Sequence, residues 1–213
     1  MMTTEDLVTA VLTPPSGVAL DHAAGELARF HRAVALGRAS TAALAVRRLP
    51  GHDGDPARTA WCEGTAAACA AGQPMWVAVC AAAAALGEGD PRGAVRAVAI
   101  GYGVAARVAA ALGPRHALSG WCQETTAGAI GAVAAAGCAA GLTAAPLRHA
   151  VGICATQAAG LSAAAETPLG PLQVGKAAGN AVEAVLLSRN GFTSAEQPLE
   201  GRRGLYALLS EGD

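Results

Sequence analysis

Apolar residues recur at helical spacing in the segment "VALDHAAGELARFHRAVALGR", residues 18–38. Leu20, Ala24, Leu27, Phe30 and Val34 fall near one face, and Asp21, Arg29 and Arg32 fall elsewhere. A spacing of three and four residues is typical of a helix that buries one face. Nowhere in the chain does an alternating pattern of useful length indicate a strand. The pattern therefore predicts an amphipathic helix here and helices as the main element of the fold.

Gly and Pro residues divide the rest of the chain into Ala-rich segments. Ala is the strongest helix former, and Gly and Pro mark the breaks. We expect helices over 57–71, 74–86, 92–112, 125–140 and 143–164, and another from the Pro/Gly break at 167–171 toward Arg189, with a turn-rich loop over 47–56. The sequence thus predicts an all-α fold, a single compact bundle of about eight helices over residues 1–213.

Four glycines recur within the segment 125–141, namely Gly128, Gly131, Gly137 and Gly141. Each costs a helix up to about 1 kcal/mol relative to Ala. Close contact between helices would offset that cost. We therefore expect this segment to pack tightly against its neighbours, as a buried helix rather than a membrane span, since Ala and Gly promote insertion poorly.

Composition and charge limit the partners. Hydrophobic residues make up 53% of the 213 positions but aromatic residues only 3%, so the core must pack small side chains closely. We expect that core to extend across a subunit interface, in a homodimer. The chain has fifteen Lys and Arg residues and sixteen Asp and Glu residues, and no basic run. This balance argues against nucleic-acid and membrane partners. Six cysteines without a C-x-x-C pair or a secretory leader indicate reduced thiols and a cytoplasmic protein.

The stretch "GWCQETT", residues 120–126, gathers polar side chains in front of the predicted Ala/Gly helix. Thr125 and Thr126 are candidate N-caps, and backbone N–H groups there suit a carboxylate. A helix N-terminus lowers a thiol pKa, which predicts a lowered value for Cys122; burial against Trp121 would raise that of Glu124. The alternative interpretation is a small buried thiol followed by ordinary capping residues.

Several phrases together resemble one known family. They are "EGTAAAC" at 63–69, "GAVRAVAIGYGVAARVAAALGP" at 93–114, the stretch from 120 to 161, and "RNGFTSAEQPLEGRRGLYALLSEG" at 189–212. In order and spacing they are similar to the large helical domain of the MmgE/PrpD family, which includes 2-methylcitrate dehydratase, cis-aconitate decarboxylase and iminodisuccinate epimerase. The resemblance implies an all-helical, usually homodimeric fold and proton abstraction beside a carboxylate. It also implies a second, α/β domain that completes the active-site cleft, which we expect to be absent because the chain stops at Asp213.

The chain departs from the family pattern where the chemistry is expected. At the positions to which the resemblance assigns catalytic or neighbouring polar residues, the chain has Glu63 for an Asn, Ala68 and Gln73 for two His, Ala70 and Ala71 in the Asp-bearing part, Cys122 for a His, Gly170 for a Lys and Gln173 for a His. A glutamine cannot take up a proton as an imidazole does. We therefore expect the family reaction, as its members carry it out, to be lost.

Two hypotheses follow for the function. The first is a repurposed lyase, isomerase or cyclase for a small polar, carboxylate-bearing metabolite, which needs neither metal nor cofactor. Its candidate catalytic residues are Cys122, Glu124 and Lys176, and its candidate substrate-binding residues are Gln73, Trp76, Trp121, Thr125, Thr126 and Gln173. The second is a non-catalytic helical subunit, with a structural role or paired with a separate chain that supplies the missing domain. In both, we expect the histidines at 22, 31, 52, 116 and 149 to be solvated or structural.

Overall fold

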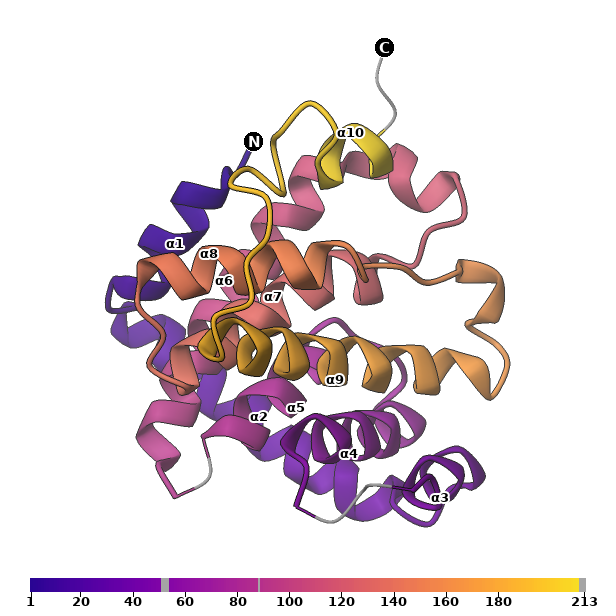
Figure 1. The fold of residues 1–213 in the computed structure, drawn as a ribbon. Coiled ribbons are helices and arrows are strands. Elements are labelled where there is room, and N and C mark those ends of the chain that lie inside the picture. Colours follow the sequence, from indigo (N-terminus) through magenta and orange to yellow (C-terminus); the bar gives the residue numbers. More distant parts are fainter. Residues whose placement is uncertain (51–53, 88, 211–213) are drawn as a thin grey trace.

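The chain folds into helices joined by short connections (Figure 1). The computed structural model describes residues 1–50, 54–87 and 89–210, and these ranges contain no strand. The helices are α1 (Thr4–Leu12), α2 (Gly17–Gly37), α3 (Thr41–Arg47), α4 (Pro56–Ala71), α5 (Trp76–Leu86), α6 (Pro91–Leu118), α7 (Gln123–Ala139), α8 (Ala144–Ala155), the 3₁₀ helix η1 (Ser162–Ala164), α9 (Leu169–Arg189) and α10 (Leu205–Leu209). The predicted all-α bundle is confirmed. His52 and the middle of the predicted loop lie outside the described residues.

Helix α7 forms the centre of the bundle. It packs against α5, α6, α8 and α9, and α4 packs along α9. In Figure 1, α8 and α9 cross the front of the molecule, α4 lies below them, and the amino terminus and α10 lie at the top. Every residue of α7 from Thr125 to Gly137 is buried, so the prediction of a buried helix is confirmed.

Glycine lets α6 and α7 approach closely. A Cβ added at Gly131 would lie 2.5 Å from the Ala105 Cβ and 2.6 Å from the Gly101 carbonyl oxygen. Gly137 faces Leu147 in the same way. Gly141 differs, because it follows α7 with φ +65° and turns the chain out of the helix. The expected close packing thus holds for the glycines within α7.

Helix α2 is amphipathic as predicted, but its buried face is rotated. Leu27 and Phe30 are buried, whereas Ala24 is exposed. The buried face also includes Glu26, whose carboxylate lies 3.4 Å from the Arg29 guanidinium. Charge alone therefore did not show which side of this helix faces the core.

Two helix boundaries differ from the predictions in ways that affect the candidate site. Helix α7 begins at Gln123, ahead of the predicted start. Helix α8 ends at Ala155 rather than near residue 164. At that end the Thr156 hydroxyl donates to the Ile153 carbonyl at 2.7 Å, and Gly160 has φ +148°, which a helix cannot contain. The chain instead runs back across the amino end of α7.

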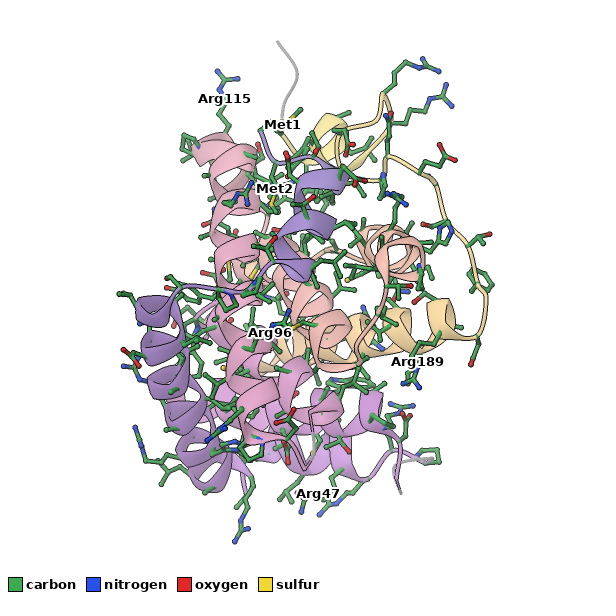
Figure 2. All side chains as sticks on the ribbon, turned by 90° about the vertical axis from the view of Figure 1, so that its left-hand side faces the viewer. Met1, Met2, Arg47, Arg96, Arg115 and Arg189 are labelled. Atoms are coloured by element: carbon green, nitrogen blue, oxygen red, sulfur yellow. The ribbon has the colours of Figure 1, made fainter. Side chains whose placement is uncertain are left out.

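One described helix, α6, is long and apolar enough to cross a membrane by length and composition alone. This is weak evidence, because a helix packed within a protein core passes the same test. Helix α6 packs against α7 and α2, and Gly113, with φ +72°, breaks it before Pro114 as the sequence predicted. Figure 2 shows Arg47, Arg96, Arg115 and Arg189 spread from one end of the molecule to the other.

Candidate active site at the amino end of α7

Cys122 is the N-cap residue of α7, and its side chain does not cap the helix. The Cys122 carbonyl accepts hydrogen bonds from the backbone N–H groups of Thr125 and Thr126, at 3.2 and 3.1 Å. Both threonine hydroxyls lie within 3.1 Å of the same carbonyl, and both side chains are buried inside the first turns. The prediction that Thr125 or Thr126 caps the helix is therefore wrong, because the helix starts before them.

Cys122 and Glu124 form a hydrogen-bonded pair. The Cys122 thiol donates to the Glu124 carboxylate across 3.3 Å, with Cys122 6% exposed and Glu124 half-buried. Burial raises the pKa of the Cys122 thiol, and the charge of Glu124 adds to that increase. The expectation of a lowered thiol pKa is wrong, because desolvation outweighs the effect of the helix end. The pair therefore combines a protonated thiol with a carboxylate that solvent can reach.

His116 joins this turn to the carboxyl-terminal helix. Its ring is fully buried and stacks on Trp121, with ring centroids 6.2 Å apart and planes 7° apart. His116 Nδ1 lies 3.0 Å from the Leu209 carbonyl oxygen, and Nε2 lies 2.7 Å from Thr126 Oγ1. A carbonyl can only accept, so Nδ1 donates, and in the neutral ring Nε2 accepts from the threonine hydroxyl.

This contact changes the expected role of Thr126. The hydroxyl is fully buried and already bonded within the protein, so it is not available to a substrate. Trp121 remains half-buried beside the pair. The structural role expected for His116 fits, but no sequence signal indicated its partners, since Leu209 is 93 positions away.

The segment between α8 and α9, residues 157–167, covers the Cys122 turn. We call it the strap. Its Gly160 carbonyl accepts from the Cys122 backbone N–H at 3.0 Å, and Ser162 N–H donates to the Gly120 carbonyl at 2.9 Å. A bridge between Trp121 and Leu161 lies between these bonds. The strap is thus attached to the turn through backbone hydrogen bonds.

Gln73 and Gln173 bind the strap. Gln73 Nε2 donates to the Ala165 carbonyl at 2.6 Å. Gln173 Nε2 donates to the Leu161 carbonyl at 3.3 Å, and its Oε1 accepts from the Leu161 N–H at 3.2 Å. In this arrangement both glutamines, which the sequence predicted to bind substrate, hold the strap through their side-chain amides.

Three helices begin at this end of the bundle. Gln73, just before α5, touches Gly170 in the first turn of α9, where an added Cβ would lie 2.5 Å from Gln73 Nε2. Met75, the N-cap residue of α5, lies against Gly128 in α7. The amino ends of α5, α7 and α9 carry partial positive charge, which favours a bound anion.

Two predicted site residues lie elsewhere. The Lys176 ammonium stacks on Trp61 of α4 at 4.5 Å from the ring centroid, and the Arg58 guanidinium lies 5.0 Å from the same ring. Trp76 is 7% exposed, with the Arg29 guanidinium 5.8 Å from its ring. Trp76, a candidate for substrate binding, is part of the hydrophobic core, and no described contact brings Lys176 to the Cys122–Glu124 pair.

A cavity of about 1160 Å³ borders the first residues of the strap. Its wall combines the end of α8, Gln157 and Ala158 with Leu187 and with residues between 192 and 209, including Phe192 and Leu208. The lining is mainly apolar and holds none of the predicted site residues. Among the described residues, no group of three or more His, Cys, Asp or Glu side chains is arranged to hold a metal ion. We therefore place the candidate site at the Cys122–Glu124 pair.

The comparison with family models decides the family. The model of the MmgE/PrpD N-terminal domain matches residues 65–213, well over half of the chain. The chain belongs to the MmgE/PrpD family. A comparison with curated proteins finds no match.

Several positions at which the chain departs from the MmgE/PrpD pattern lie close together in the structure. Positions 73, 122, 170 and 173, to which the resemblance assigns His and Lys, come from three separate segments. In the structure, Gln73 touches Gly170, while Cys122 and Gln173 both contact the strap. The positions thus converge although their side chains have changed.

Proposed function

We propose that this MmgE/PrpD chain is a lyase, isomerase or cyclase acting on a small carboxylate-bearing metabolite. The observation that carries the proposal is the hydrogen bond between Cys122 and Glu124 at the amino end of α7. A new activity is most easily built where a fold already has its site. Family membership makes chemistry beside a carboxylate the natural starting point.

Glu124 is the proton acceptor in this proposal. Its carboxylate removes a proton from the carbon next to the substrate carboxylate, and the electron pair left on that carbon either expels a leaving group or is protonated again. The Cys122 thiol, kept protonated by burial, donates a hydrogen bond to Glu124 and orients it. The amino ends of α5, α7 and α9 favour the substrate carboxylate and the charge that develops on it. A positioned acid or base group contributes about a hundredfold to ten-thousandfold to the rate.

A second candidate function is a non-catalytic helical subunit. The specific observation that favours it is that Gln73 and Gln173, which stand where the resemblance places two imidazoles, are bonded to the strap. In that case the fold has a structural role or pairs with another chain. Both candidates include a homodimer in the cytoplasm, in keeping with the small-residue core and six free cysteines.

Solvent-deuterium exchange separates the two functions without knowledge of the product. The purified chain is incubated in D₂O with a panel of small di- and tricarboxylates, and mass spectrometry follows deuterium uptake at carbon. We expect uptake into at least one panel member, and at least a tenfold lower rate for Glu124→Gln, the low end for one base.

The matched control is Glu183→Gln, the same change at an exposed site on α9. It should keep the wild-type exchange rate. Thermal unfolding followed by circular dichroism confirms that both variants fold. If Glu124→Gln exchanges as fast as the wild type, the assignment of the base is wrong. If no carboxylate exchanges, the non-catalytic function is favoured.

A further inference from the structure

The strap is held to the bundle mostly by hydrogen bonds. Of residues 157–167, only Ala158 and Ala164 are buried, and Leu161 is 59% exposed. In Figure 1 the strap is the orange connection at the right-hand side, between the end of α8 and the start of α9. Segments with few buried apolar contacts open at a lower free energy than the core around them. The low burial of the strap is therefore typical of a segment that opens locally.

The two glutamines hold the strap on either side of η1. Gln173, from the first turns of α9, binds both backbone groups of Leu161. Gln73, from the connection between α4 and α5, binds the carbonyl of Ala165 beyond η1. The Gln73 bond joins positions 92 apart and the Gln173 bonds join positions 12 apart, and each glutamine can be removed without changing the strap itself.

The strap lies directly on the Cys122 turn at Gly160. A Cβ added at Gly160 would overlap the Thr125 hydroxyl and would lie 3.2 Å from the Cys122 Cβ. The Cys122 N–H also donates to the Gly160 carbonyl. Cys122 is buried at 6% exposure in this arrangement, so moving Gly160 away uncovers the thiol and widens access to Glu124.

We propose that the strap is a gate over the Cys122–Glu124 pair and that Gln73 and Gln173 are its latch. When the strap opens, both amides lose their backbone partners and become free to bind polar groups of a ligand in the uncovered site. The latch and the opening follow from the structure of this chain alone. The role of the gate in admitting a substrate rests on the function proposed above.

The accessibility of Cys122 to iodoacetamide measures the opening. The measurements use the full chain with Cys69→Ala and Cys138→Ala, which leaves only buried thiols. Each lost hydrogen bond raises the open population about fivefold. We therefore expect Cys122 to react about fivefold faster in Gln73→Ala and more than tenfold faster in Gln73→Ala/Gln173→Ala. Gly160→Ala, which pushes the strap off Cys122, should have a similar effect to the double variant.

The matched control is Gln157→Ala, the same change at an exposed glutamine within the strap. It should react within about twofold of the background protein, since its side chain is not part of the latch. Hydrogen exchange of residues 158–165 should rise in the latch variants and not in the control. Peptide mapping shows which thiols react.

Three results would overturn the gate. One is an unchanged Cys122 rate in both the double variant and Gly160→Ala. Another is an equal acceleration in Gln157→Ala. The last is simultaneous alkylation of Cys80 and Cys154, which would mean that the whole fold opens rather than the strap. The two proposals can fail separately. If the latch variants react as expected but Glu124→Gln keeps full deuterium exchange, the assignment of Glu124 as the base is wrong and the gate is still supported.

Discussion

Because α6 packs closely against α7, we expect replacement by Ala to have opposite effects on stability at two nearby glycines of α6. A Cβ added at Gly101 would lie 2.6 Å from the Gly131 carbonyl oxygen, 2.7 Å from the Ala135 Cβ and 2.8 Å from Val79 Cγ1. A Cβ added at Gly103 meets no atom within 4 Å. Both residues lie inside α6, so Ala improves the local helix propensity equally at the two positions.

The two effects differ enough in size to decide the sign. Replacing Gly by Ala in a helix gains about 1 kcal/mol, and overpacking a core costs about 1–3 kcal/mol. For Gly101 we take the upper end of the overpacking cost, because the atom nearest to the added Cβ is the Gly131 carbonyl oxygen, and a backbone atom cannot rotate aside. Gly101→Ala should therefore lower the free energy of unfolding by about 2 kcal/mol, and Gly103→Ala should raise it by about 1 kcal/mol.

Urea denaturation of the two variants tests this difference. The unfolding midpoints should move in opposite directions. The slope of the free energy of unfolding against urea concentration should stay constant, because neither change alters the surface exposed on unfolding. If both variants shift the same way, or differ by less than about 1 kcal/mol, then α6 and α7 do not approach as closely as described.

Other measurements test the buried thiols, the assembly and the lost family reaction. Burial raises the pKa of Cys154 and that of Tyr206 each to about 12, so above about pH 9 the unfolded chain releases protons that the folded chain keeps. Stability should hold below about pH 8 and then fall by up to about 1.4 kcal/mol per pH unit for each such group; urea titrations from pH 7 to 11 should show a shallower fall in Cys154→Ala. Sedimentation at micromolar concentration should give a dimer, and a species of only the 20.9 kDa chain mass would contradict it. Turnover of 2-methylcitrate or cis-aconitate should be at least a hundredfold below that of typical family enzymes, and normal turnover would mean that the replaced positions are misassigned.

The sequence was sufficient to predict the helical class and most helix positions. Ala-rich segments favour helix locally, and Gly or Pro ends it, as at Gly113 and Gly191, which both have positive φ. The end of α8 was missed because "TQAAGLSAAA" has no strong helix breaker except Gly160, whose φ depends on contact with α7. Local propensity does not include that contact.

The candidate site was predicted only in part. The sequence pointed to Cys122 and Glu124, which the structure joins by a hydrogen bond. It gave the wrong direction for the thiol pKa, because burial depends on how the whole bundle closes over the turn. It also named Lys176 as a candidate catalytic residue, whereas packing of α9 against α4 brings this lysine to Trp61.

The sequence by itself determined most of the helical segments, which family the chain resembles and which of the family's acid and base residues are gone. Only the tertiary structure decided that Gln73 and Gln173 bind the strap, that His116 links α10 to α7, and that Cys122 is covered. The physical reason is the separation along the chain over which each interaction acts. Helix propensity and capping act over a few residues, whereas the bond from Gln73 to Ala165 joins positions 92 apart and depends on tertiary packing.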